Sequence, residues 1–294
     1  MISTIIESLN YQKEVLTEIP SDLQCLLNKV KLKHYDELYE EYDDITSSLT
    51  DDLTEVLKKF ANGNKSINHI RYIWMTLIIS LAVEPTLEYY DPNNNLPLNV
   101  IKLMESFFSY QLTLVNGSSK SINPNRLNQL INEIFKSHES YFHRKEANFQ
   151  AISEALDVFY NAIRVLDYNQ SVEAIVEILE DCLEGYAIFP GSYGRRELFD
   201  WWLLDVVPTS YKLLPPTMFY VVEGVKNKEE IRSRQTRLLA KISKRIRSYL
   251  PELILEFKQY NNYIFPTPGK INRAALKNSG KIQYQSKSPQ LAYS

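Results

Sequence analysis

The sequence has little of what metal proteins and many enzymes show as short motifs. It contains only two cysteines, Cys25 and Cys182, whose wide separation fits neither a disulfide framework nor a zinc knuckle. It has four histidines and no H-E-x-x-H, P-loop, G-x-G-x-x-G or G-x-S-x-G pattern. Because no catalytic set is complete, we expect no metal and no cofactor, and the sequence favours a non-enzymatic role.

Long hydrophobic runs are also missing. The longest, Tyr72 to Val83, has 12 residues, whereas a membrane-spanning helix needs roughly 20. It is therefore interpreted as part of a buried helix. The first residues have no basic region and no long apolar stretch, which predicts that there is no signal peptide. With two isolated cysteines, this pattern indicates a cytoplasmic protein.

The apolar content of the chain is enough for a sizeable core, with 44% hydrophobic and 12% aromatic residues among 294. Apolar residues recur at helical spacing along most of the sequence. Strand signals are confined to Ala187–Phe189 and Thr217–Val222. The sequence therefore predicts an all-α, irregular multi-helix globular bundle, with room for one short two-stranded element within 187–222.

Helix boundaries are predicted from capping residues and prolines. We expect a first helix at 2–17, a helix at 67–81 that Pro85 follows, and a helix from 228 to about 260 that Pro251 kinks or splits. The residues expected to cap further helices are Ser21 or Asp22, Thr50 or Asp51, and Ser171.

Charge divides the chain. Residues 1–223 hold 18 Lys and Arg against 32 Asp and Glu, whereas residues 224–294 hold 15 against 4. We predict an acidic helical domain at 1–183, and an interrupted segment with a long basic helix at 184–265 that packs on it as one globule. A basic, disordered tail is predicted at 266–294. The basic part could either be displayed as a binding surface or be neutralised by the acidic part.

The segment from Gly185 to Gly224 breaks the helical pattern. It holds two of the three tryptophans and four of the 13 prolines. A glycine loop that leads into a helix beginning with two arginines could bind an anion. The alternative is that the arginines pair with upstream carboxylates. Candidate residues for binding an anion or a partner are Gly191, Ser192, Gly194, Arg195, Arg196, Trp201 and Trp202.

The same stretch, IFPGSYGRRELFDWWLLDVV, resembles the start of a nucleotidyltransferase site. Gly191 and Ser192 match the phosphate-binding turn of that family, and Asp205 lies at an acceptable distance for a metal-binding carboxylate. The family's second carboxylate is absent, since Val207 stands two residues after Asp205. The resemblance implies a phosphate-handling enzyme that uses Ser192, Arg195, Arg196 and Asp205, but without a complete metal cradle.

The helix predicted at 228–250 has two faces. Its apolar stripe consists of Ile231, Leu238, Ile242, Ile246 and Tyr249. A basic ridge beside the stripe consists of Arg234, Arg237, Lys241 and Lys244. This ridge could contact nucleic acid phosphates, an anionic membrane or an acidic protein.

Three functions remain open at this point. The first is a cytoplasmic regulatory or scaffolding protein that binds another macromolecule, a protein or a nucleic acid, through residues 185–224 and the basic helix. The second is the phosphate-handling enzyme. The third is a binder of an apolar ligand, with a pocket lined by Trp74, Trp201 and Trp202.

Overall fold

The computed structural model describes residues 19–34, 38, 47–61, 65–114, 128–129, 131–134, 136–137, 148–183, 186–188, 194–222 and 224–256. All its helices belong to one compact unit, Met1–Ile264. They are α2 (Ser21–Lys33), α3 (Ser47–Phe60), α4 (Lys65–Tyr90), α5 (Leu96–Leu114), α7 (Phe149–Arg164), the 3-10 turn η1 (Tyr168–Gln170), α8 (Ser171–Leu183), α9 (Arg195–Trp201), the π-helix η2 (Trp202–Val206), α10 (Val207–Tyr211) and α11 (Lys228–Glu256). The predicted all-α fold is confirmed, and the described residues contain no strand.

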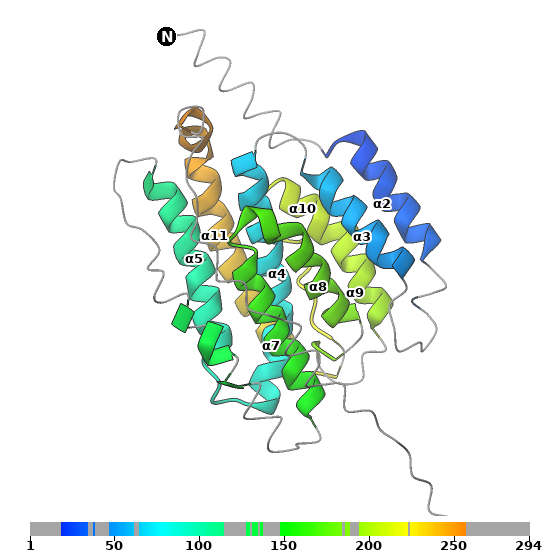
Figure 1. Ribbon diagram of the computed structural model, residues 1–294, viewed down its shortest axis with the longest axis vertical. Helices are drawn as coiled ribbons and strands as arrows, with labels where there is room; N and C mark the ends of the chain where they lie inside the picture. Colours follow the sequence, from blue (N-terminus) through cyan, green and yellow to red (C-terminus); the bar gives the residue numbers. More distant parts are fainter. Residues whose placement is uncertain are drawn as a thin grey trace, which may run out of the picture. The chain divides into compact units, whose positions relative to one another are not determined.

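Helix α4 is the centre of the bundle (Figure 1). It packs against α5, α7, α8, α10 and α11. The side chains from Ile67 to Val83 are buried all around the helix, as expected for a helix enclosed on every side. Helix α4 is long and apolar enough to cross a membrane by length and composition alone, but 94% of its most apolar window lies inside the protein. The interpretation of Tyr72–Val83 as part of a core helix is confirmed.

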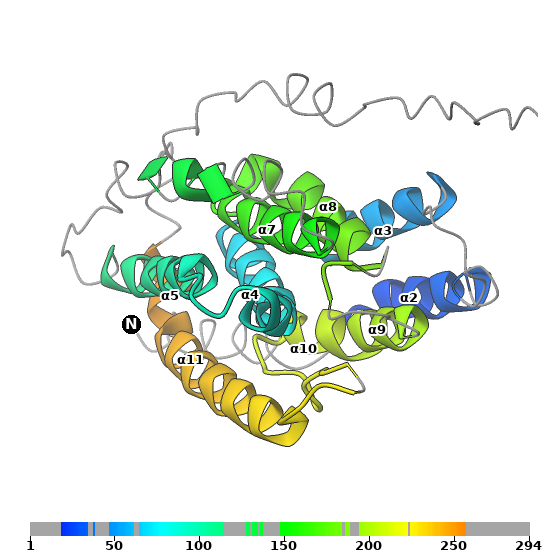
Figure 2. The same cartoon turned by 90° about the horizontal axis from the view of Figure 1, so that it is seen from below.

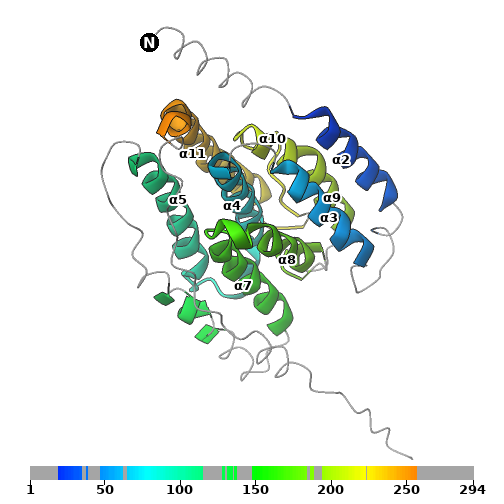
Figure 3. The ribbon, with the colours of Figure 1, turned by 45° about the horizontal axis from the view of Figure 1, so that its top comes forward.

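Two groups of helices cover α4. Helices α7 and α8 pack together, and α8 also packs against α3 (Figure 2). Helix α11 lies on the other side, where it contacts α4 and α5. Helices α2 and α3 lie side by side (Figure 3), and α2 also contacts η2. The elements that follow residue 184 are thus packed directly on the elements that precede it.

One predicted helix boundary is wrong because packing overrides a local signal. Pro85 lies inside α4, which continues to Tyr90. A proline inside a helix costs about 3 kcal/mol, but each large apolar side chain buried nearby contributes about 1.5–3 kcal/mol. Val83 and Leu87 are both fully buried. The helix predicted from 228 to about 260 is α11, which ends at Glu256; it contains Pro251, as predicted, and is not split there.

The predicted caps also differ from the structure. Helix α3 begins at Ser47, so Thr50 and Asp51 lie in its first turns, where the Thr50 hydroxyl donates to Glu180 Oε1 of α8 at 2.7 Å. The Ser171 hydroxyl donates to the carbonyl oxygens of Val165 and Asp167 instead of accepting from a backbone N–H. Asp167 caps the 3-10 turn η1 before α8, since its side chain accepts from the N–H of Asn169. Helix α2 begins at Ser21 without a side-chain cap and ends at Lys33, before Leu38.

Several sequence predictions fall outside the described residues. These are the helix at 2–17 and the tail at 266–294.

Candidate functional site

The segment that follows Gly194 is helical. Helices α9, η2 and α10 follow one another without a break from Arg195 to Tyr211. The π-helical turn precedes Pro208, and the Val207 N–H bonds to the carbonyl oxygen of Trp202, five residues back. Because Pro208 has no N–H to donate, a wider turn at this point accommodates the proline. Asp205 therefore lies on a helix, and not on the strand that a nucleotidyltransferase site would require.

The Asp205 side chain is used to hold another segment, Thr217–Val222, which we call the strap. Its Oδ1 accepts from the Thr217 N–H at 2.9 Å and from the Thr217 hydroxyl at 3.0 Å. Its Oδ2 accepts from the Met218 N–H at 3.1 Å. At Thr217 and Met218, a side chain and not a partner strand thus accepts the backbone N–H groups. The two-stranded element considered for 187–222 is absent from the described residues of that range.

The two adjacent tryptophans have different surroundings. Trp202 is buried in the core, with a relative exposure of 1%. Trp201 is half-buried at the surface, its Nε1 donates to the Met218 carbonyl oxygen at 2.8 Å, and its ring packs against Phe219 and Tyr220. The strap is thus fastened to α9 and η2 from Trp201 as well as from Asp205. On its other side, Arg232 Nε of α11 donates to the Phe219 carbonyl oxygen at 3.1 Å.

The predicted anion loop is only partly within the described residues. Gly191 and Ser192 lie outside them. Gly194 is buried, and its carbonyl oxygen accepts the Leu198 N–H at 2.8 Å to open α9. A Cβ added at Gly194 would lie only 2.6 Å from the Tyr220 hydroxyl oxygen, so this glycine permits a close approach of the strap. Arg195 and Arg196 follow it in the first turn of α9, and both are half-buried.

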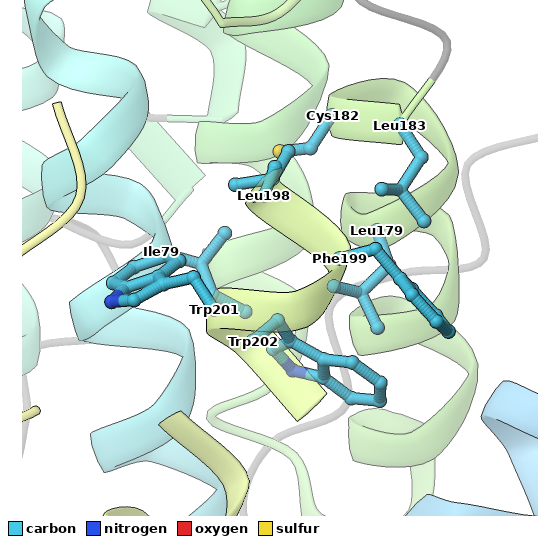
Figure 4. A pocket seen from close by; sticks show the side chains of 8 residues that line it. All are labelled: Ile79, Leu179, Cys182, Leu183, Leu198, Phe199, Trp201 and Trp202. Atoms are coloured by element: carbon cyan, nitrogen blue, oxygen red, sulfur yellow. The ribbon is translucent and has the colours of Figure 1, made fainter. Parts of the chain in front are cut away.

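A small pocket lies behind α9 (Figure 4). Its volume is about 10 Å³, which is room for roughly one water molecule. It is lined by Ile79, Leu179, Cys182, Leu183, Leu198, Phe199, Trp201 and Trp202. Ligand pockets usually measure about 300–1,000 Å³. Trp74 does not line this pocket, and its Nε1 donates to the Leu214 carbonyl oxygen elsewhere in the core at 2.9 Å.

The basic ridge of α11 is on the surface. Arg234, Arg237, Lys241 and Lys244 are all exposed, as is Arg245 beside them. The opposite side of α11 is buried through Ile231, Gln235, Leu239, Ile242, Ser243 and Ile246. We call the four exposed residues Arg237, Lys241, Lys244 and Arg245 the basic face. No carboxylate in the described part of the chain forms a salt bridge with any of the four.

Arg234 differs from its neighbours because it is neutralised. Its Nη2 lies 3.2 Å from Glu84 Oε2 and 3.3 Å from Glu88 Oε2, both on α4. The buried side chain of Gln235 also donates to Glu84. Burial raises the pKa of Glu84, and the interactions with Arg234 and Gln235 only partly offset this effect. Arg234 therefore fastens α11 to α4, and Arg237 marks the beginning of the displayed positive charge.

Negative charge gathers on α7 and α8. The carboxylates on these two helices are Glu154, Asp157, Glu173, Glu177, Glu180 and Asp181. The one basic residue of these two helices, Arg164, is buried and forms ion pairs with Glu173 at 3.2 Å and with Glu177 at 2.6 Å. Arg234 of α11 forms its ion pairs with α4 instead, and Arg232 pairs with Glu229 of the same helix. Within the described residues, the acidic part thus neutralises Arg234 through Glu84 and Glu88 of α4, whereas the basic face forms no salt bridge.

Other titratable residues serve packing. His34 Nε2 lies 2.7 Å from Asp52 Oδ2, and Lys33 Nζ lies 2.6 Å from the same oxygen, so one carboxylate joins α2 to α3. Burial lowers the pKa of His69 to about 4, and its Nε2 lies 2.9 Å from the Val165 carbonyl oxygen. The described residues contain no cluster of three or more His, Cys, Asp or Glu side chains that could hold a metal ion.

Sequence reasoning missed two features of this site. Leu239, fully buried, was left out of the apolar stripe, whereas the chosen Leu238 is only half-buried. Ile231, Gln235, Leu239 and Ile246 recur at helical spacing. This pattern predicts that Leu239 is buried once the polar Gln235 is also taken as a residue that faces the core. The role of Asp205 had no sequence signal, because its partners lie 12 and 13 residues away.

The fold and the site define an all-α protein with one strongly basic helical face. Comparison of the chain with protein-family models, curated proteins and solved structures finds no match.

Proposed function

We propose that this protein is a non-enzymatic regulatory or scaffolding protein that binds a negatively charged macromolecule through the basic face of α11. The observation that carries the proposal is the set of four exposed cations, Arg237, Lys241, Lys244 and Arg245, without a salt-bridged carboxylate in the described chain. Like charges gathered on one face repel one another. A polyanion bound to this face relieves the repulsion. The field of the four cations also attracts polyanions from a distance and raises their concentration near the face.

The arrangement of α11 supports this proposal. Its inner side is anchored by the buried Leu239 and Ile246 and by the bond from the Ser243 hydroxyl to the Leu213 carbonyl oxygen at 2.6 Å. The basic face is thus mounted on a helix whose position the core fixes. A face held in this way loses less conformational freedom on binding than a flexible basic segment does.

The described part of segment 185–224 has a supporting role in this proposal. Trp201, Asp205 and Gly194 hold the strap, and the strap receives Arg232 of α11. These contacts connect α9 and η2 to the first turns of α11. The contact surface for the partner is therefore assigned to α11 itself, and the strap helps to hold that helix in place.

Retention on a sulfated polysaccharide column tests this function. We expect the wild type to be retained at low salt, and Lys241→Glu/Lys244→Glu to elute at clearly lower salt. The matched control is Lys29→Glu/Lys58→Glu, which makes the same change of net charge at two exposed lysines of α2 and α3. Equal elution of the two double variants, or no retention of the wild type, would contradict the proposal.

A further inference from the structure

The basic face has the composition of a surface that contacts phosphates. From Ser233 to Ser248, the other exposed residues of α11 are Arg234 and four small or hydroxyl-bearing residues, Ser233, Thr236, Ala240 and Ser248, whereas the first turn carries the exposed Glu229 and Glu230. Among the described side chains of α11, no large hydrophobic one is exposed. Arginine, lysine, serine and threonine are the side chains that usually contact nucleic acid phosphates.

The same composition disfavours an acidic protein as the partner. Binding sites between proteins are centred on aromatic and apolar anchors, and lysine is depleted there. The exposed large hydrophobic side chains of the described chain are Leu32, Tyr89, Leu98, Tyr186, Leu204 and Met218, all outside α11. The basic face therefore offers a protein partner positive charge but no exposed aromatic or large apolar side chain at which an interface could be centred.

The basic face also has the length of a short stretch of nucleic acid backbone. Arg237 and Arg245 are eight residues apart, which corresponds to about 12 Å along a helix. One strand of a duplex presents a phosphate about every 3.4 Å of its axis. Side chains three and four residues apart, such as Lys241 and Lys244 or Arg237 and Lys241, are neighbours on the helix surface. Four cations can thus meet about three or four successive phosphates.

The setting of α11 favours the outside of a duplex over other nucleic acid forms. The inner side of α11 is buried against α4 and α5. The helix therefore cannot insert fully into a groove of a duplex, and only its exposed side can contact nucleic acid. Single-strand binding relies on exposed aromatic rings on which bases stack, and the described side chains of α11 offer none.

Resting on the proposed function, we infer that the partner is double-stranded nucleic acid, held through its phosphate backbone without regard to base sequence. Contact sites are Arg237, Lys241, Lys244 and Arg245. The sequence beyond α11 adds Lys258, Lys270, Arg273, Lys277, Lys281 and Lys287, with no acidic residue after Glu256.

Fluorescence anisotropy with a labelled duplex of mixed sequence tests the inference, using the full chain at several salt concentrations. Each phosphate neutralised on a duplex contributes a slope of about 0.9 to the dependence of log affinity on log salt. We expect a slope of at least about 3, and a second duplex of scrambled sequence that binds equally well. Lys241→Gln/Lys244→Gln should lower the slope by about 2, whereas the control Lys29→Gln/Lys58→Gln should leave it unchanged.

Two further probes separate this inference from the proposed function. Polyglutamate of matched charge and vesicles with anionic phospholipids present negative charge without a duplex. If either binds as tightly as the duplex and depends on Lys241 and Lys244, the duplex inference is overturned and the proposed function stands. If none of the three probes binds at low salt, or if both double variants lose affinity equally, the duplex inference and the proposed basic face both fail.

Discussion

Asp205 and Thr217 are joined by two hydrogen bonds to one carboxylate oxygen. Asp205 Oδ1 accepts from both the backbone N–H and the hydroxyl of Thr217, at 2.9 and 3.0 Å. Asp205 Oδ2 accepts from the Met218 N–H. The Asp205 side chain thus accepts two backbone N–H groups that would otherwise need backbone partners. It also holds the strap, which leads toward α11, against η2.

Replacing Asp205 should loosen the strap. In Asp205→Asn an amide NH₂ faces one of the two backbone N–H donors, so at least one bond is lost. We expect a fall in the free energy of unfolding of about 1–2 kcal/mol, and faster hydrogen exchange at Thr217 and Met218. Denaturant unfolding and exchange measurements check this. Asp51→Asn, at an exposed position, is the control and should change stability by less than about 0.5 kcal/mol.

The contact of Gly194 with Tyr220 should be sensitive to a single methyl group. Gly194→Ala places its Cβ 2.6 Å from the Tyr220 hydroxyl oxygen, and overpacking of this kind costs about 1–3 kcal/mol. Tyr220→Phe removes that oxygen, so the double variant should be more stable than the sum of the two single effects predicts. Additive effects in a thermal unfolding cycle would show that the two residues are not in contact.

Asp52 should contribute to acid sensitivity. Burial raises the pKa of Asp52, but the hydrogen bonds and charges of Lys33 and His34 more than offset this effect. The pKa of Asp52 therefore lies below the ordinary value of 3.8. Its stabilising contribution is therefore present above about pH 4 and lost as the pH falls through the lowered pKa. We expect Asp52→Asn to be less stable than the wild type at pH 6, with a difference that shrinks below pH 4. Chemical denaturation at both pH values measures it, and a difference independent of pH would contradict it.

Removing the carboxylates that pair with Arg234 should enlarge the basic face. In Glu84→Gln/Glu88→Gln, Arg234 keeps its place on α11 but loses both ion pairs. One additional cation should raise the salt slope of duplex binding by about 0.9. The control Glu55→Gln/Glu197→Gln changes net charge equally at two exposed positions and should leave the slope as it is. An equal rise in both variants would assign the effect to net charge alone.

The register of α11 is tested by two adjacent leucines. Leu239 is fully buried and Leu238 half-buried. Leu239→Ala should lower the free energy of unfolding by about 2–5 kcal/mol, the usual cost of a cavity in a core, and Leu238→Ala by clearly less. Urea unfolding of both variants gives the comparison. The reverse order would mean that the helix presents a different side to α4 and α5, and that the basic face is displaced with it.

The sequence predicted the kind of fold, because the apolar residues of α7 and α8 recur at helical spacing and α4 contains the continuous apolar run Tyr72–Val83. It predicted the ends of helices poorly. Pro85 and Ser171 carry strong local signals, but burial around α4 outweighs the proline, and Ser171 donates to Val165 and Asp167. Such outcomes depend on residues that only the fold brings close.

The candidate site shows the same limit. The ridge of α11 could be predicted because its spacing lies within one helix. That Arg234 is neutralised while Lys241 is displayed depends on Glu84 and Glu88, about 150 residues earlier in the chain. The strap carries one of the two strand signals of the sequence, but its residues form no strand. Nothing local showed that Asp205 and Trp201 would satisfy its backbone instead.

The position of α4 also has a consequence for biosynthesis. This helix is made before α11, one of the helices that cover it, because α4 ends at Tyr90 and α11 begins only at Lys228. At about 5–20 residues per second, the buried surface that faces α11 waits on the order of 10 to 30 s for its partner. Until then the nascent chain exposes an apolar helix with the carboxylate of Glu84 at its edge. A chaperone that shields α4 during this interval would protect the chain from aggregation until α11 arrives.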